Sequence, residues 1–108
     1  MLILLSSRQP YVTLIVMRIT VRFRGPIAGR MGTPETSLDF EDTVSIRDLL
    51  RRLIDARDEV RGVWSTPEQL NQNTLLLRNG VDIELTGGLD TRLGNGDSVV
   101  ILPLVHGG

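Results

Sequence analysis

The chain has 108 residues, of which 41% are hydrophobic and 23% charged, and its 12 basic and 13 acidic residues leave a formal net charge of −1. This length and balance are typical of one folded domain, argue against disorder, and argue against a general nucleic-acid binder. The sequence contains no cysteine and no lysine, and His106 is its only histidine. These absences exclude disulfides, thiolate metal sites, lysine chemistry and catalytic triads within the chain.

Residues 1–16 precede a clear change of pattern, and we expect them to be a dispensable extension. The apolar run Met1–Leu5 has no basic residue before it, is followed by Arg8 and Pro10, and is too short to cross a bilayer. Two alternatives remain: Tyr11–Val16 lengthens the strand that follows, or the segment is a targeting signal. We expect a cytoplasmic protein without a membrane partner.

Strict alternation over Met17–Arg24 predicts a half-buried strand. Its inward side is apolar: Ile19, Val21 and Phe23. Residues 25–32 are rich in glycine and contain Pro26, which predicts a long, mobile loop. A second alternating run over residues 37–40 then predicts the return strand of an antiparallel hairpin, with Leu38 and Phe40 inward.

A helix is predicted after this hairpin, because Ser45 and Asp48 have the spacing of a capping box. Thr43 is an alternative N-cap. Apolar residues then recur at helical spacing: Ile46, Leu49, Leu50, Leu53 and Ile54. We expect Gly62 to end this region and Pro67–Leu70 to form a further short turn of helix.

The second half of the chain predicts three more strands. Thr74–Arg78 and the alternating run Val81–Leu85 flank Asn79-Gly80, the strongest short signal for a hairpin. Val99–Leu102 is apolar on both faces, which predicts a central strand covered on both sides, ended or kinked by Pro103.

Strands and helices do not alternate along the chain, so a doubly wound fold is not expected. We predict an α+β fold in which one main helix crosses one face of a mixed sheet of four or five strands. The predicted organisation is an extension over residues 1–16, a domain over residues 17–103 and a flexible tail over residues 104–108.

The segment from Leu76 to Gly108 resembles a known family. Its stretches LLRNGVDIEL, GLDTRL and GDSVVILPLVHGG follow each other as hairpin, turn, last strand and Gly-Gly tail. Together with the sheet and helix, this order resembles the ubiquitin-like β-grasp sulfur carriers and small modifiers. The MoaD/ThiS-like carriers of molybdopterin and thiamin synthesis, the archaeal small modifiers and the ubiquitin-related modifier belong to this family.

The resemblance implies that Gly108 is the reactive residue. In the family, a partner enzyme of the ubiquitin-activating type adenylates the terminal carboxylate, and a sulfur donor converts it to a thiocarboxylate. This chain is then a carrier and not an enzyme; it binds no cofactor or metal, and the partner supplies ATP and magnesium. The remaining tail residues are implied to bind that partner: Pro103, Leu104, Val105, His106 and Gly107.

Elementary chemistry supports this use of the tail. The six residues Pro103–Gly108 reach about 20 Å when extended, and glycine passes a narrow channel because it lacks a Cβ. The sequence ends at Gly108, so we expect no processing step before activation.

Several fates remain open for the activated tail. Sulfur could go to a molybdopterin-type cofactor, through the large subunit of a synthase, or to tRNA, thiamin or cysteine synthesis. The alternatives are a modifier joined to lysines of target proteins and a β-grasp module that docks without covalent chemistry. Without lysine, the chain cannot grow side-chain-linked polymers on itself.

Other candidate features favour plain structural roles. The basic run of Arg18, Arg22, Arg24 and Arg30 is interpreted as a solvated strand face, with an acidic partner or RNA as the alternative. His106 is interpreted as a solvated tail residue, and Trp64 as packing at the sheet edge. The carboxylate pairs at residues 41–42 and 58–59 are interpreted as capping or solvated groups, and the glycines at residues 87–88 and 94–96 as turns.

Overall fold

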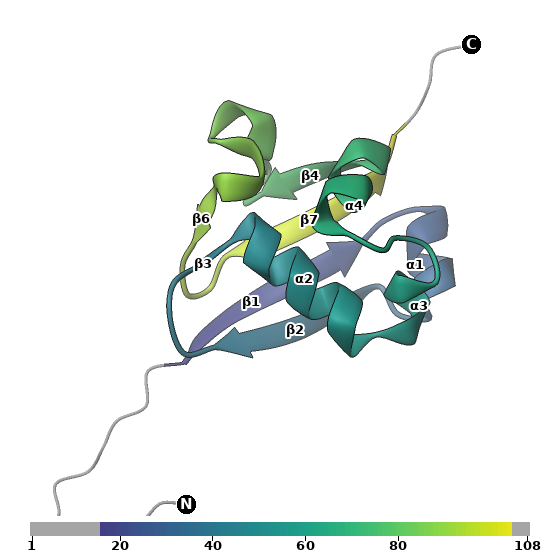
Figure 1. Ribbon diagram of the computed structural model, residues 1–108, viewed down its shortest axis with the longest axis horizontal. Coiled ribbons are helices and arrows are strands. Elements are labelled where there is room, and N and C mark those ends of the chain that lie inside the picture. The colour runs from purple at the N-terminus through teal and green to yellow at the C-terminus, as the bar shows by residue number, and fades with distance from the viewer. Residues whose placement is uncertain (1–15, 105–108) are drawn as a thin grey trace, which may run out of the picture.

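The computed structural model describes residues 16–104, so the predictions for residues 1–15 and for Val105–Gly108 lie outside the described residues. Figure 1 shows one layer of strands with helices in front of it, and the described chain enters and leaves at opposite ends of that layer. The main sheet has five strands in the order β2-β1-β7-β4-β5. The predicted α+β fold with a mixed sheet is confirmed.

The strands of the main sheet are β1 (Met17–Phe23), β2 (Glu35–Phe40), β4 (Thr74–Arg78), β5 (Val81–Asp82) and β7 (Ser98–Pro103). The β1 strand runs antiparallel to β2 and parallel to β7, and β7 runs antiparallel to β4. The last strand is therefore central, as predicted. A separate antiparallel pair is formed by β3 (Val44–Ser45) and β6 (Arg92–Leu93).

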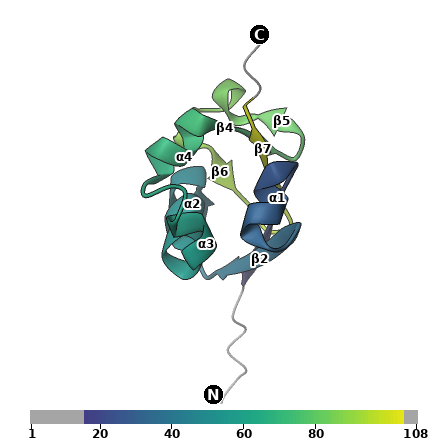
Figure 2. The same ribbon diagram turned by 90° about the vertical axis from the view of Figure 1, so that its right-hand side faces the viewer.

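The helices are α1 (Pro26–Met31), α2 (Ile46–Ala56), α3 (Asp58–Arg61) and α4 (Pro67–Asn73), with the 3₁₀ helices η1 (Ile83–Leu85) and η2 (Gly88–Asp90). Figure 2 shows that α2, α3 and α4 lie on the same side of the sheet, while α1 lies at one end of it. The single main helix that the sequence predicts is α2.

The start of α2 is fixed by the predicted capping box. The Ser45 hydroxyl accepts the Asp48 N–H at 3.1 Å, and the Asp48 carboxylate accepts the Ser45 N–H at 3.1 Å. These hydrogen bonds hold the pKa of Asp48 below its usual range. Ser45, and not Thr43, is therefore the N-cap.

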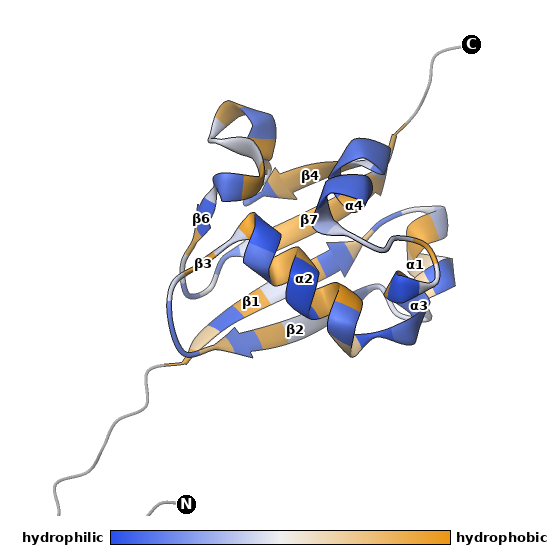
Figure 3. Ribbon diagram, in the orientation of Figure 1, coloured by the Kyte–Doolittle hydropathy of each residue, from blue (hydrophilic) through white to orange (hydrophobic). Residues whose placement is uncertain are grey.

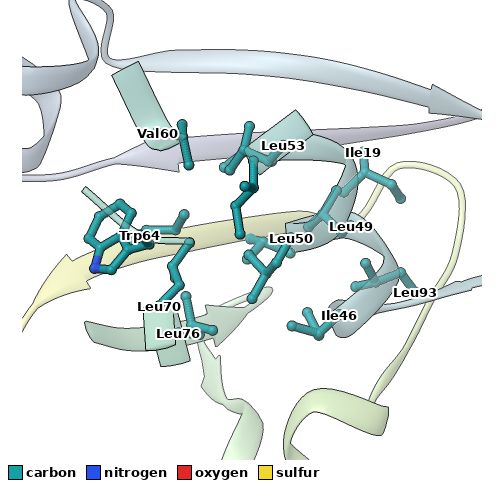
Figure 4. Close-up of a cluster of buried hydrophobic side chains, with 14 of the residues drawn as sticks. Ile19, Ile46, Leu49, Leu50, Leu53, Val60, Trp64, Leu70, Leu76 and Leu93 are labelled. Atoms are coloured by element: carbon teal, nitrogen blue, oxygen red, sulfur yellow. The ribbon is translucent and has the colours of Figure 1, made fainter. Parts of the chain in front are cut away.

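The core lies between α2 and the sheet. Figure 4 shows Leu49, Leu50 and Leu53 of α2 in one cluster with Ile19 and Leu76 of the strands. All five side chains are buried, and burial of each stabilises the fold by roughly 1.5–3 kcal/mol. In Figure 3 hydrophobic colour runs along β7, whereas α2 carries both hydrophilic and hydrophobic residues, as expected of a helix with one buried face.

The loop predicted for residues 25–32 is wrong, because this segment contains α1. Pro26 stands at the first helical positions, where a missing N–H costs nothing, and Gly32 ends the helix with a left-handed φ of 73°. Ile27 and Met31 are buried. Two apolar residues four positions apart thus give the short helix its inner face.

The strand predicted for Val81–Leu85 is only two residues long. After Asp82 the chain turns into η1, and the Asp82 carboxylate accepts the Glu84 N–H at 2.9 Å. Of the alternating apolar residues only Ile83 is buried, whereas Val81 is 46% and Leu85 is 79% exposed. The alternation therefore does not mark a half-buried strand.

Candidate functional site

The candidate tail begins where β7 ends. Pro103 is the last residue of β7 and is half-buried, and Leu104, which follows it, is 41% exposed. The other candidate residues, Val105, His106, Gly107 and Gly108, lie outside the described residues. The structure thus places the first two tail residues, Pro103 and Leu104, which we call the tail root.

The tail root is held by strands on both sides of β7. Pro103 is paired with Thr74 of β4, and the Arg24 N–H donates to the Ile101 carbonyl at 3.1 Å. Gly25 sits against the ring of Pro103: a Cβ added there would lie 3.5 Å from its Cγ, and Gly25 has a φ of 60°. Pro103 is therefore held in a fixed position at the end of the central strand, and the rest of the tail begins from there.

The side of β7 that faces away from α2 is apolar. Leu75 pairs with Leu102, and Leu77 pairs with Val100, and all four side chains are half-buried. Because α2, α3 and α4 lie on the other side (Figure 2), the expectation that this strand is covered on both sides is wrong. The four residues form a patch, which we call the open-face patch, that leads to the tail root.

Two of the four arginines in the basic run are paired with β2. Arg18 Nε lies 2.9 Å from Asp39 Oδ1, and Arg22 Nε lies 3.6 Å from Glu35 Oε1. The hydrogen bond from Arg18 holds the pKa of Asp39 below its usual range. These exposed pairs lie directly across the β1–β2 ladder, as the interpretation of a solvated strand face expects.

The other two arginines lie near the tail root. Arg24 directly follows β1 and is exposed, and Arg30 is exposed in the last turn of α1. Neither has a carboxylate partner among residues 16–104. Unpaired positive charge therefore gathers at the end of the sheet where the tail begins.

A cleft of about 360 Å³ opens beside the tail root. Its apolar lining includes Ile27 of α1, Trp64 from the segment after α3, and both tail-root residues, and Arg30 lies at the same cleft. Trp64 is only 5% exposed and belongs to the core, so its predicted packing role is confirmed. The sequence did not reveal the cleft, because one of its walls is the helix that was expected to be a loop.

Carboxylates of the pairs at residues 41–42 and 58–59 bind neighbouring arginines or a backbone N–H, as expected of solvated or capping groups. Asp58 pairs with Arg61, Glu59 lies 3.7 Å from Arg57, and the Asp42 carboxylate accepts the Thr43 N–H at 2.7 Å. In the part of the chain that the structure describes, no group of three or more His, Cys, Asp or Glu side chains could hold a metal ion.

The predicted turns at the glycines are confirmed. Gly87, Gly88 and Gly96 have positive φ values of 114°, 63° and 86°. The Gly94 N–H donates to the Asp97 carboxylate at 2.7 Å.

Across residues 16–104, no helix is both long enough and apolar enough to span a membrane.

Comparison with known proteins agrees with this architecture. The sequence model of the ThiS family matches residues 21–108. Among solved structures, small archaeal modifier protein 1 (SAMP1) from Methanosarcina acetivorans is similar, with 28% identity and a TM-score of 0.67 over 87% of this chain and 99% of that one.

Two further structures are similar to this chain. The Haloferax volcanii HVO 2177 protein has 26% identity and a TM-score of 0.69 over 86% of this chain and 88% of its own. Mycobacterium tuberculosis CysO has 25% identity and a TM-score of 0.62 over 81% of this chain and 99% of its own. No curated protein matches the chain.

Proposed function

The chain belongs to the ThiS family, and from that premise we propose that it is a sulfur carrier that is adenylated and then thiocarboxylated at Gly108. Carriers of this family are not enzymes themselves, so the chain is the substrate of an adenylating enzyme. The observation that carries the proposal is the tail root: the central strand ends at Pro103, and the five residues that follow it end in Gly107-Gly108.

The proposed chemistry has two stages. A carboxylate oxygen of Gly108 attacks the α-phosphorus of ATP, pyrophosphate leaves, and an acyl-adenylate forms. A persulfide then attacks the acyl carbon and AMP leaves. A thiol cleaves the resulting acyl disulfide, which releases the Gly108 thiocarboxylate and leaves the oxidised disulfide on the donor. The partner enzyme provides the ATP site and magnesium.

The contribution of this chain is to bring the Gly108 carboxylate into the active site of the adenylating enzyme. The last two residues are glycines, which lack a Cβ and fit a narrow channel to the active site. The open-face patch of Leu75, Leu77, Val100 and Leu102 leads directly to the tail root and offers apolar area for the enzyme to cover. Docking on this face would place the tail at the channel entrance.

Pyrophosphate release by the adenylating enzyme of the ubiquitin-activating type from the same organism tests the proposal. Removing Gly107 and Gly108 takes away the reactive carboxylate and its two glycines, so release above the enzyme's background should be lost. Gln72→Ala is the control, because Gln72 is exposed on α4 and lies outside both the tail and the patch that leads to it, and it should retain the full rate. Equal release with the truncated and the intact chain would contradict the proposal.

The similarity to SAMP1 favours a second fate for the same adenylate, conjugation to lysines of other proteins. An amine replaces the persulfide, and AMP again leaves. The chain contains no lysine and its last arginine is Arg92, so trypsin would leave residues 93–108 on the modified lysine. Mass spectrometry of cellular proteins should find this remnant if conjugation occurs, and its absence from cells that express the chain would exclude this fate.

A further inference from the structure

The cleft beside the tail root shares no lining residue with the open-face patch, and it is lined by α1, the segment after α3, residues 73–74 and the end of β7. Resting on the function proposed above, we propose that it is a second docking site for the adenylating enzyme. The cleft takes one apolar side chain of that enzyme, and an acidic side chain beside it pairs with Arg30.

The short distance from the tail root to Gly108 supports this location. Four residues follow Leu104, and they span at most about 14 Å when fully extended. When the Gly108 carboxylate lies in the enzyme's active site, the enzyme surface therefore lies within that distance of Leu104. Leu104 lines the cleft, so the cleft faces the enzyme during adenylation.

The lining favours an apolar side chain as the occupant. Ile27, Val63, Trp64 and Pro103 contribute to the walls, and Figure 4 shows the Trp64 indole at the edge of the core cluster with its nitrogen on the side away from Leu50. Within residues 16–104 the structure gives this indole N–H no hydrogen-bond acceptor. Tryptophan in protein interfaces commonly combines apolar contact with such a donor.

The charge beside the cleft favours an acidic neighbour. Arg30 lines the cleft, is exposed, and has no carboxylate partner in the described part of the chain. By contrast, Arg18 and Arg22 of β1 both have one. An unpaired guanidinium at the rim of an apolar recess is suited to a carboxylate of a partner.

Trp64 provides a direct probe of the cleft, because it is the only tryptophan in the chain. The full chain is labelled with 5-fluorotryptophan, and its single fluorine resonance is recorded while the unlabelled enzyme is added without ATP. We expect the resonance to shift or broaden as the complex forms. Binding that leaves the resonance unchanged would overturn the inference.

The same signal distinguishes other occupants. Removing Gly107 and Gly108 should leave the resonance of the free chain unchanged; a shift would show that the chain's own tail fills the cleft. The resonance should also not depend on the concentration of the free chain; a dependence would indicate a second copy. Either result would overturn the proposed occupant.

Charge reversal tests the pairing at Arg30. Arg30→Glu should raise the Kd for the enzyme about tenfold at low salt, and Arg30→Lys should recover most of the affinity. The control is Arg51→Glu on α2, an exposed arginine outside the cleft, which should change Kd by less than about twofold. Equal effects of the two reversals would contradict the pairing.

Filling the cleft provides an independent test. Asn73 lines the cleft and is exposed, whereas its neighbour Gln72 is exposed outside it. Asn73→Phe should weaken binding several-fold and Gln72→Phe should not, with circular dichroism confirming that both variants are folded. If the enzyme adenylates the unmodified chain but all cleft variants bind alike, only this inference fails. If the unmodified chain is not adenylated, the proposed function fails first.

Discussion

Asp97 joins three parts of the chain through one carboxylate. It accepts the Gly94 N–H at 2.7 Å, Arg78 Nε at 2.9 Å and Asn79 Nδ2 at 2.9 Å, and its side chain is 12% exposed. Burial raises the pKa of Asp97, but the hydrogen bonds from Asn79, Gly94 and Arg78 lower it by more, so it lies below its usual range. This carboxylate stabilises the turn from which β7 begins.

We predict that Asp97→Ala lowers the free energy of unfolding at pH 7 by about 2–3 kcal/mol, because hydrogen bonds to a charged group are lost. A lowered pKa in the folded state means that this stability is present above the ordinary pKa of about 4 and is lost as pH falls through the folded pKa. The difference in the free energy of urea unfolding between the unmodified chain and Asp97→Ala should therefore shrink as the pH falls from about 5 to about 2.

Asp55→Ala is the control for this measurement, because Asp55 is exposed on α2 and a surface change there should cost less than about 0.5 kcal/mol. A difference between Asp97→Ala and the unmodified chain that stays constant with pH would show that packing, and not the charged carboxylate, stabilises the turn.

At the scale of single residues, the sequence was informative wherever the partners are close along the chain. The Asn79-Gly80 turn was predicted, and both residues have positive φ, 50° and 86°. The Ser45–Asp48 box was also predicted from its spacing. The role of Asp97 was not, because its partner Arg78 lies 19 positions away and only the pairing of β4 with β7 brings them together.

Alanine substitutions at two glycines of the α1 helix should change the free energy of unfolding in opposite directions. Gly29 lies within α1 and Gly32 is its C-cap with a φ of 73°, and an added Cβ would meet nothing within 4 Å at either position. Gly29→Ala should raise the free energy of unfolding by about 0.5–1 kcal/mol because alanine favours the helix. Gly32→Ala should lower it by about 1–2 kcal/mol because of the left-handed backbone.

Thermal unfolding of both variants measures this pair of effects. If residues 26–31 were a mobile loop, as the sequence pattern suggested, neither substitution would change stability by more than a few tenths of a kcal/mol. Two changes of the same sign would also contradict the helix.

The elements that the sequence predicted well are those with several repeats of their period. The α2 helix shows two turns of apolar spacing and a cap, and β1 shows a full alternating run. The α1 helix has only Ile27 and Met31 to mark its inner face, among three glycines. Over Val81–Leu85 the alternation was misleading, because the Asp82 carboxylate caps η1 and turns the chain.

At the scale of the whole molecule, the central position of β7 could be predicted from its apolar sequence, but its surroundings could not. Only the strand order shows that Val100 and Leu102 pair with Leu77 and Leu75 on a face without α2, α3 or α4. The cleft depends equally on tertiary structure, since its walls come from four separate parts of the chain: residues 26, 27 and 30, residues 63–64, residues 73–74 and residues 103–104. The tail chemistry is implied by the resemblance of Leu76–Gly108 to the family.

The proposed function requires that the Gly108 carboxylate become a thiocarboxylate. Intact mass spectrometry after incubation with the adenylating enzyme, ATP and a persulfide donor measures this directly. We predict a species about 16 Da heavier than the unmodified chain, because sulfur replaces one carboxylate oxygen. The chain without Gly107 and Gly108 should not gain this mass. If the intact chain also keeps its original mass, while the same enzyme thiocarboxylates another carrier in parallel, the central claim is contradicted.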